Sequence, residues 1–180
     1  SPKSHGDRVY TDTMEMPEAP TLAQQFRDAG YQAYAVGKLH VYPQRNRIGF
    51  DDALITEEGR YEFGVVDDYQ IWLGEKGYAG TEFLHGMGNN SYYTRPWHLP
   101  EELHPTNWVT REMIRMIKRK DPTRPGFYFA SYQFPHPPLV PLQAYYDMYS
   151  DDEIDMPINA AWNEMSVLPI TTIREHAQSY

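Results

Sequence analysis

A length of 180 residues allows one domain with a sizeable core, and a net charge of −9 at pH 7 argues against nucleic acid binding, which requires clustered Lys and Arg. The chain has no cysteine and so forms no disulfide, and no apolar run approaches the roughly 20 residues of a membrane span. No signal peptide is visible, which leaves the localisation open between cytoplasmic and periplasmic or secreted.

The first expected elements are a helix and a strand. Residues 1–19 are polar and turn-rich and carry no periodic pattern. A helix is predicted from the N-cap Thr21 to Gly30, a residue type suited to the end of a helix. The buried stripe of this helix is expected to comprise Leu22, Ala23, Phe26 and Ala29. Residues 31–36 then form an apolar strand.

Loops dominate the middle of the chain. Residues 41–65 are predicted to be irregular, and a helix at about residues 66–76 is expected to end at Gly77. Residues 78–104 form a loop whose length is usually functional in a compact domain. The acidic clusters lack EF-hand spacing and are interpreted as solvated turns: Asp51-Asp52, Asp67-Asp68 and Asp151-Asp152-Glu153.

The clearest helix is predicted to begin near residue 105, with Thr106 or Asn107 as its cap, and to end before Asp121. Its apolar residues recur at helical spacing and are expected to face the core: Trp108, Val109, Met113, Met116 and Ile117. The basic run at residues 115–120 is interpreted as a solvated face of this helix.

Beyond that helix, a strand is predicted at residues 127–132 and a short helix near residues 142–149. Residues 150–170 are acidic and contain proline, so they are expected to form a long connection. Residues 172–178 resemble the start of another helix. The alternation of helix, glycine, strand and loop favours an α/β fold.

Three side chains with binding or acid–base chemistry follow the two predicted strands. Lys38 and His40 lie two residues apart, so in an extended segment both can face one pocket. His136 follows the second strand in the sequence FPHPP. Because ligands of open α/β sheets bind at the carboxyl ends of the strands, these residues predict a site for an oxyanion such as sulfate or phosphate.

Two blocks of this sequence resemble blocks of the type I sulfatases. The first combines PTLAQQFRDAGY (residues 20–31), VGKLH (36–40) and GFD (49–51), and looks like the family's TLAxxLxxAGYxTxxVGKWHLG…GFD. The second is similar to the later PHxPxxxPxxY block, and comprises SYQFPHPP (131–138) and PLQAY (141–145). The blocks occur in the family's order and span residues 17–149.

The resemblance implies a fold and a set of site residues. The fold would be α/β, part of an alkaline phosphatase-like three-layer sandwich with a mainly parallel sheet that is incomplete in this chain. Lys38 would bind the sulfate oxygens, His40 would accept a proton from the formylglycine hydroxyl, and His136 would protonate the leaving alcohol. These three are taken as catalytic residues; Lys38 and His136 are also taken as substrate-binding residues.

Plainer interpretations of the same residues stay open. Lys38 could be a surface lysine, and His40 and His136 could be loop histidines bonded to carbonyl groups. His104 is a further candidate for substrate binding, although it precedes a helix and could act as its cap. The remaining histidines carry no motif and are interpreted as unremarkable: His5, His85, His98 and His176.

Parts of the family's site have no counterpart in this sequence. The nucleophile of the family is a Cys or Ser in C/S-x-P-x-R that is matured to formylglycine, and the chain contains no such motif. By the resemblance, this motif would lie upstream and the calcium ligands would lie outside the chain, so no metal ligand is assigned. We expect residues 1–180 to be an internal segment of a sulfatase catalytic domain: an irregular lead (1–19), a core with active-site loops (20–150), and a connection that enters a helix (150–180).

The expected function is a segment of a sulfuric ester hydrolase that acts on a small-molecule sulfate ester and is inactive alone. One alternative is a phosphonate or phosphodiester hydrolase of the same superfamily, in which Tyr and Thr tend to replace the Lys-x-His pair. Another is a non-catalytic binding domain. Neither nucleic acid nor a membrane is an expected partner, and the oligomeric state is open, with association through incomplete sheet edges as one route.

Overall fold

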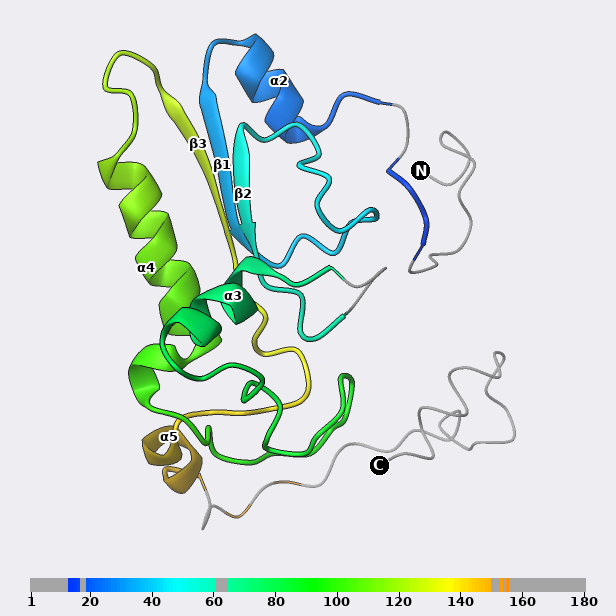
Figure 1. Ribbon diagram of the computed structural model, residues 1–180, viewed down its shortest axis with the longest axis vertical. Helices are drawn as coiled ribbons and strands as arrows, with labels where there is room; N and C mark the ends of the chain where they lie inside the picture. Colours follow the sequence, from blue (N-terminus) through cyan, green and yellow to red (C-terminus); the bar gives the residue numbers. More distant parts are fainter. Residues whose placement is uncertain (1–12, 17–18, 61–64, 150–152, 154, 156–180) are drawn as a thin grey trace.

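The computed structural model describes residues 13–16, 19–60, 65–149, 153 and 155 (Figure 1). Within these ranges, three parallel strands form one sheet in the order β2-β1-β3: β1 (Gln32–Gly37), β2 (Asp52–Ile55) and β3 (Gly126–Ser131). The register pairs Gly37 of β1 with Ile55 of β2 and with Ser131 of β3. All three strands therefore reach the same edge of the sheet at their carboxyl ends.

One face of the sheet is covered by α2 (Leu22–Asp28). The side chain of Thr21 caps this helix by accepting a hydrogen bond from the backbone N–H of Gln24 at 3.1 Å, as the sequence predicted. The predicted buried stripe is only partly correct, because Leu22 is 62% exposed and Ala29 is also exposed. Ala23 alone of the four is buried, packed with Ala33, Ala35 and Phe50.

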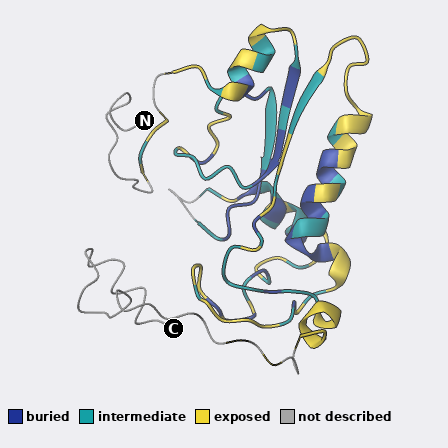
Figure 2. Ribbon diagram, turned by 180° about the vertical axis from the view of Figure 1, so that it is seen from behind, coloured by how far each residue is buried: buried dark blue, intermediate teal, exposed yellow. Residues whose placement is uncertain are grey.

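The opposite face is covered by α3 (Asp68–Glu75) and α4 (Pro105–Lys118). Val36 of β1 packs there against Tyr69, Leu73 and Trp108, because alternate residues of a strand point to opposite faces. Helices on both faces of a parallel sheet make three layers, and the prediction of an α/β fold with a parallel sheet is confirmed. Figure 2 shows the buried residues concentrated in β1 and along one side of α4.

The start of α4 differs from the prediction. His104 caps this helix in place of Thr106 or Asn107, since its Nδ1 accepts a hydrogen bond from the backbone N–H of Thr106 at 3.2 Å. The predicted apolar stripe is largely confirmed, but Ile117 is 43% exposed. A single turn of 3-10 helix, η1 (Glu101–Leu103), precedes the helix.

The strand β2 was not predicted, because the sequence reading treated residues 41–65 as irregular. β2 has only four residues, and acidic side chains precede and follow it, so it carries no period-two pattern long enough to detect. The remaining predicted elements are confirmed within a few residues, including the short helix α5 (Gln143–Asp147). The predictions for residues 1–12 and 156–180 lie outside the described residues.

Candidate active site

A sharp turn follows β1 and brings its end against β3. Gly37 has φ +115°, and the backbone N–H of Lys38 donates to the carbonyl of Ser131 at 3.0 Å. A Cβ atom at Gly37 would lie 1.8 Å from that carbonyl oxygen, so only glycine fits here. The residues after Gly37 consequently leave the sheet at its carboxyl edge. His40 completes the turn with φ +53°, a left-handed conformation that is uncommon for any residue other than glycine.

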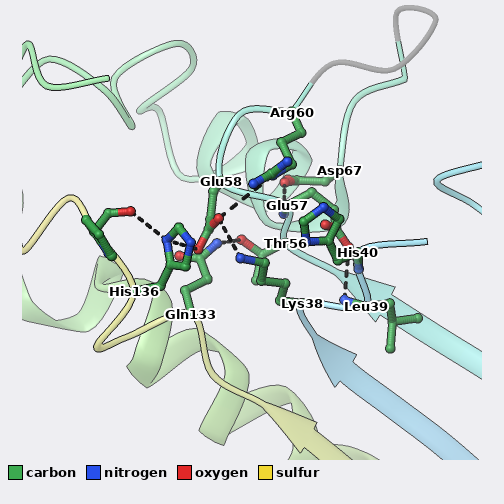
Figure 3. Close-up of polar contacts among 11 residues, drawn as sticks. Lys38, Leu39, His40, Thr56, Glu57, Glu58, Arg60, Asp67, Gln133 and His136 are labelled. Carbon is green, nitrogen blue, oxygen red and sulfur yellow. Dashed lines mark hydrogen bonds and ion pairs between the residues drawn. The ribbon is translucent and has the colours of Figure 1, made fainter. Parts of the chain in front are cut away.

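Lys38 and His136 meet on one carboxylate, that of Glu58 (Figure 3). Nζ of Lys38 lies 2.8 Å from Oε2 of Glu58, and Nδ1 of His136 lies 3.6 Å from Oε1. The Nε of Arg60 approaches the same carboxylate at 4.0 Å. The Glu58 side chain is only 7% exposed, and it lies between the Lys38 ammonium, which follows β1, and the His136 ring, which follows β3.

Glu57 holds the backbone of the turn that carries Lys38 and His40. Its Oε1 accepts hydrogen bonds from the backbone N–H groups of Leu39 and His40, both at 2.9 Å. Burial raises the pKa of the Glu57 carboxyl, and the nearby Asp67 charge adds to this, whereas the two N–H donors and the Lys38 ammonium lower it. The backbone of His40 is therefore tied to Glu57 within the same turn (Figure 3).

Asp67 links this turn to a helix. One of its oxygens, Oδ2, accepts from the backbone N–H of Glu57, and the other, Oδ1, accepts from the N–H of Gln70 to cap α3, both at 2.8 Å. Burial is the main cause that raises the pKa of Asp67. Asp67 is 2% exposed, so the interpretation of this acidic pair as a solvated turn is wrong.

His136 is held by its own loop. Its backbone N–H donates to the carbonyl of Gln133 at 3.0 Å, and ring Nδ1 lies 2.7 Å from the carbonyl of Pro137. Because a carbonyl only accepts, Nδ1 carries the proton of that bond, and Nε2 is the nitrogen left for a ligand. The side chain of Gln133 in turn donates to Thr56 Oγ1 at 2.7 Å, which ties this loop to the residue before Glu57.

His104 lies in a neighbouring cavity. Its Nδ1 accepts the capping bond from Thr106, so Nε2 carries the proton and donates to the carbonyl of Val140 at 3.1 Å. Burial lowers its pKa. The cavity that it lines, of about 500 Å³, also includes Phe134 and Tyr145, whereas the cavity beside Glu58 and His136 does not include His104. The structure thus brings together Lys38 and His136 but not His104.

A small cavity of about 30 Å³ adjoins Glu58 and His136 and has further polar residues in its lining. Among them, Glu82 accepts a hydrogen bond from the Gln70 side chain at 2.9 Å, and its pKa is raised to about 8, first by burial and then by the Asp67 charge. His85, which the sequence reading set aside, is also buried there.

Sequence reasoning missed the roles of Glu57, Glu58 and Glu82. The one available signal was the pair of glutamates that follows the apolar triplet Ala53-Leu54-Ile55 after one intervening residue, Thr56. In the described ranges, no three His, Asp or Glu side chains are grouped so as to hold a metal ion. None of the helices described combines the length and apolarity needed to cross a membrane.

Comparison with known proteins gives relatives that include two sulfatases. The chain is 37% identical to an arylsulfatase of Clostridium perfringens (90% of this chain, 36% of the relative) and 24% identical to a choline-sulfatase of Rhizobium meliloti (95% and 33%). It is 30% identical to a multifunctional alkaline phosphatase superfamily protein of Trinickia caryophylli (77% and 30%). The chain therefore spans about a third of the length of these relatives. The profile of the Sulfatase family matches residues 3–180, and the chain belongs to this family.

Proposed function

We propose that the complete protein containing this chain is a sulfuric ester hydrolase, to which the chain contributes Lys38, His40 and His136. The observation that carries the proposal is the Glu58 carboxylate, an anion held between the ammonium of Lys38 and the ring of His136. A sulfate group is also an anion with oxygen acceptors, and these groups lie at the carboxyl edge of the sheet, where ligands of such folds bind.

The chain's own residues support separate tasks in ester cleavage. Lys38 binds a sulfate oxygen and stabilises the charge that develops on it. His136 presents Nε2 to the ester and, as the imidazolium with a proton on each nitrogen, donates the Nε2 proton to the leaving alcohol, while the carbonyl of Pro137 accepts from Nδ1 and the Glu58 carboxylate lies 3.6 Å from it. His40 lies two residues after Lys38 and supplies an imidazole that can accept a proton.

The nucleophile and the metal belong to other parts of the complete protein in this proposal. The chain has no C/S-x-P-x-R motif, and its described residues include no metal-holding group, so neither group fits here. Formylglycine would supply the attacking hydroxyl, and calcium would supply positive charge at the sulfate, as is typical of the family. No catalytic step is assigned to either group from this structure.

The substrate class is a small sulfate ester. Relatives named as arylsulfatase and choline-sulfatase support a sulfate ester without choosing between an aromatic and an alkyl alcohol. A phosphodiester hydrolase is the second candidate, favoured by the similarity to the multifunctional superfamily protein. The presence of both Lys38 and His40 favours sulfate over this alternative. A non-catalytic binding domain is a third reading, which turnover by the complete protein would exclude.

The test is replacement of Lys38 by Ala in the complete protein. The variant should lose roughly a hundredfold or more in kcat/KM on an aryl sulfate, because it loses a charge that acts mainly in the transition state. The control is Lys76→Ala, an exposed lysine at the end of α3, which should behave like the unaltered protein. Equal activities of the two variants would refute the site. Faster turnover of a phosphodiester than of the sulfate by the unaltered protein would favour the second candidate.

A further inference from the structure

The conformation of the turn that carries Lys38 and His40 is fixed by a residue outside the turn, Glu57. The left-handed backbone at His40 (φ +53°) costs on the order of 1 kcal/mol or more, and such a conformation persists only where the surroundings fix it. The N–H groups of Leu39 and His40 point to one oxygen, Oε1 of Glu57, at 2.9 Å each. Two adjacent N–H groups can converge on one atom only when the backbone turns, so this oxygen and the turn specify each other.

Hydrogen bonds to three other segments of the chain fix the position of residues 56–57. Glu57 is 2% exposed, and its backbone N–H donates to Asp67, the N-cap of α3. The preceding residue, Thr56, donates its N–H to the carbonyl of Gly37 at 3.2 Å and accepts from the Gln133 side chain at 2.7 Å. Segment 56–57 thus contacts the turn after β1, the loop before His136 and the N-terminus of α3.

We infer that Glu57 is a positioning residue of the site: its carboxylate oxygen holds the left-handed turn that aims Lys38 and His40 at the bound sulfate ester. The inference rests on the proposed function, because it assigns Glu57 a task that acts through Lys38 and His40. Glu57 does not contact the substrate in this account. Its buried oxygen is already engaged by two backbone donors, whereas the neighbouring Glu58 faces Lys38 and His136.

A positioning role for Glu57 and a role in fold stability alone predict different kcat values for Glu57 variants. Glu57→Gln keeps an oxygen that accepts both N–H bonds, so kcat should stay within a few-fold of the unaltered protein. Glu57→Ala removes the acceptor, and kcat should fall by roughly tenfold to a hundredfold with a smaller change in KM, because a misplaced group loses mainly transition-state contacts. A residue that only stabilises the fold would change the folded fraction but not the kcat of the folded molecules.

The control is Glu112→Ala. Glu112 is also a buried glutamate with two polar partners, Arg111 and Arg115, but all three lie on α4 and not on the turn. Kinetics on an aryl sulfate, normalised to the folded fraction from circular dichroism, should show a normal kcat for this variant. Unchanged kcat in folded Glu57→Ala, or an equal fall in both alanine variants, would overturn the inference.

A third variant keeps the test decisive if Glu57→Ala does not fold. Glu57→Asp keeps the charge but is one methylene too short to reach both N–H groups, so it should have a lower kcat than Glu57→Gln. The opposite order would show that charge, and not reach, matters, and would overturn the inference. Lys38→Ala separates the two hypotheses: if it is active, the proposed function fails, whereas an inactive Lys38→Ala with a fully active Glu57→Ala refutes the positioning role alone.

Discussion

At the residue scale, Glu58 places a negative charge between the two side chains of the proposed site, Lys38 and His136. Its carboxylate lies 2.8 Å from Nζ of Lys38 and 3.6 Å from Nδ1 of His136. A sulfate that binds to the Lys38 ammonium would therefore have to displace this carboxylate. The pair is largely shielded from water, since the two side chains are 15% and 7% exposed. If the proposed function is correct, Glu58 opposes the binding of a second anion at Lys38 in this arrangement.

Glu58→Gln should strengthen the binding of inorganic sulfate to the complete protein. Removing one negative charge close to the bound anion should lower the inhibition constant of sulfate by about fivefold to tenfold at low ionic strength, as expected for about 1 kcal/mol of repulsion. Inhibition of aryl sulfate turnover measures the effect. Glu75→Gln, an exposed acid of α3, is the control. Weaker sulfate inhibition in Glu58→Gln would mean that the carboxylate assists the anion instead.

At the scale of the elements, the contact between the ends of β1 and β3 depends on Gly37. Gly37→Ala should destabilise the fold by about 1–2 kcal/mol for the positive φ and by a further 1–3 kcal/mol for the contact with the Ser131 carbonyl. Gly77→Ala is a matched control, because Gly77 has φ +86° with no atom within 4 Å of an added Cβ. Urea unfolding of both variants checks the prediction, and equal losses would contradict the role of the Ser131 contact.

The buried carboxyl Glu82, between α3 and η1 in the chain, should make stability depend on pH. Its folded-state pKa of about 8 lies above the ordinary value of 4.5, so between these values the folded chain retains a proton that the unfolded chain has released. Stability contributed by the neutral carboxyl is present below about pH 4.5 and is lost as the pH rises through about 8.

Glu82→Gln should remove this pH dependence, because the amide stays neutral and its oxygen can still accept from the Gln70 side chain. The variant should resemble the unaltered protein near pH 5 and unfold at a higher temperature near pH 8.5. Thermal unfolding at the two pH values measures the difference. Glu75→Gln serves again as the exposed control, and a variant less stable than the unaltered protein at pH 8.5 would refute the assignment.

At the scale of the whole molecule, the sequence predicted the helix and sheet layers of the fold better than it predicted which residues contact Lys38 and His40. Glycines after α2 and α3, and apolar runs before Lys38 and His136, give local signals that a parallel α/β arrangement explains. Glu57 and Glu58 gave only the weak signal of a glutamate pair after an apolar triplet, because their contacts depend on a four-residue strand that places residue 57 beside residue 39. Contacts of this kind depend on tertiary packing and not on local periodicity.

The 180-residue chain by itself should not hydrolyse a sulfate ester. It offers a cation and two imidazoles, but its sequence has no cysteine and no serine in the C/S-x-P-x-R motif, so the covalent route of the family has no nucleophile. Within the described residues, each of β2 and β3 is paired on one side only, which leaves its other edge unpaired there.

The experiment compares the purified chain, the same chain after heat denaturation, and the complete protein on a chromogenic aryl sulfate. Only the complete protein should release the chromophore, and its activity should depend on Lys38. Turnover by the native chain above the denatured control would mean that a side chain within residues 1–180 attacks sulfur directly or activates water to do so. In that case Lys38→Ala and His136→Ala in the chain itself would show whether the reaction uses the groups that meet on Glu58.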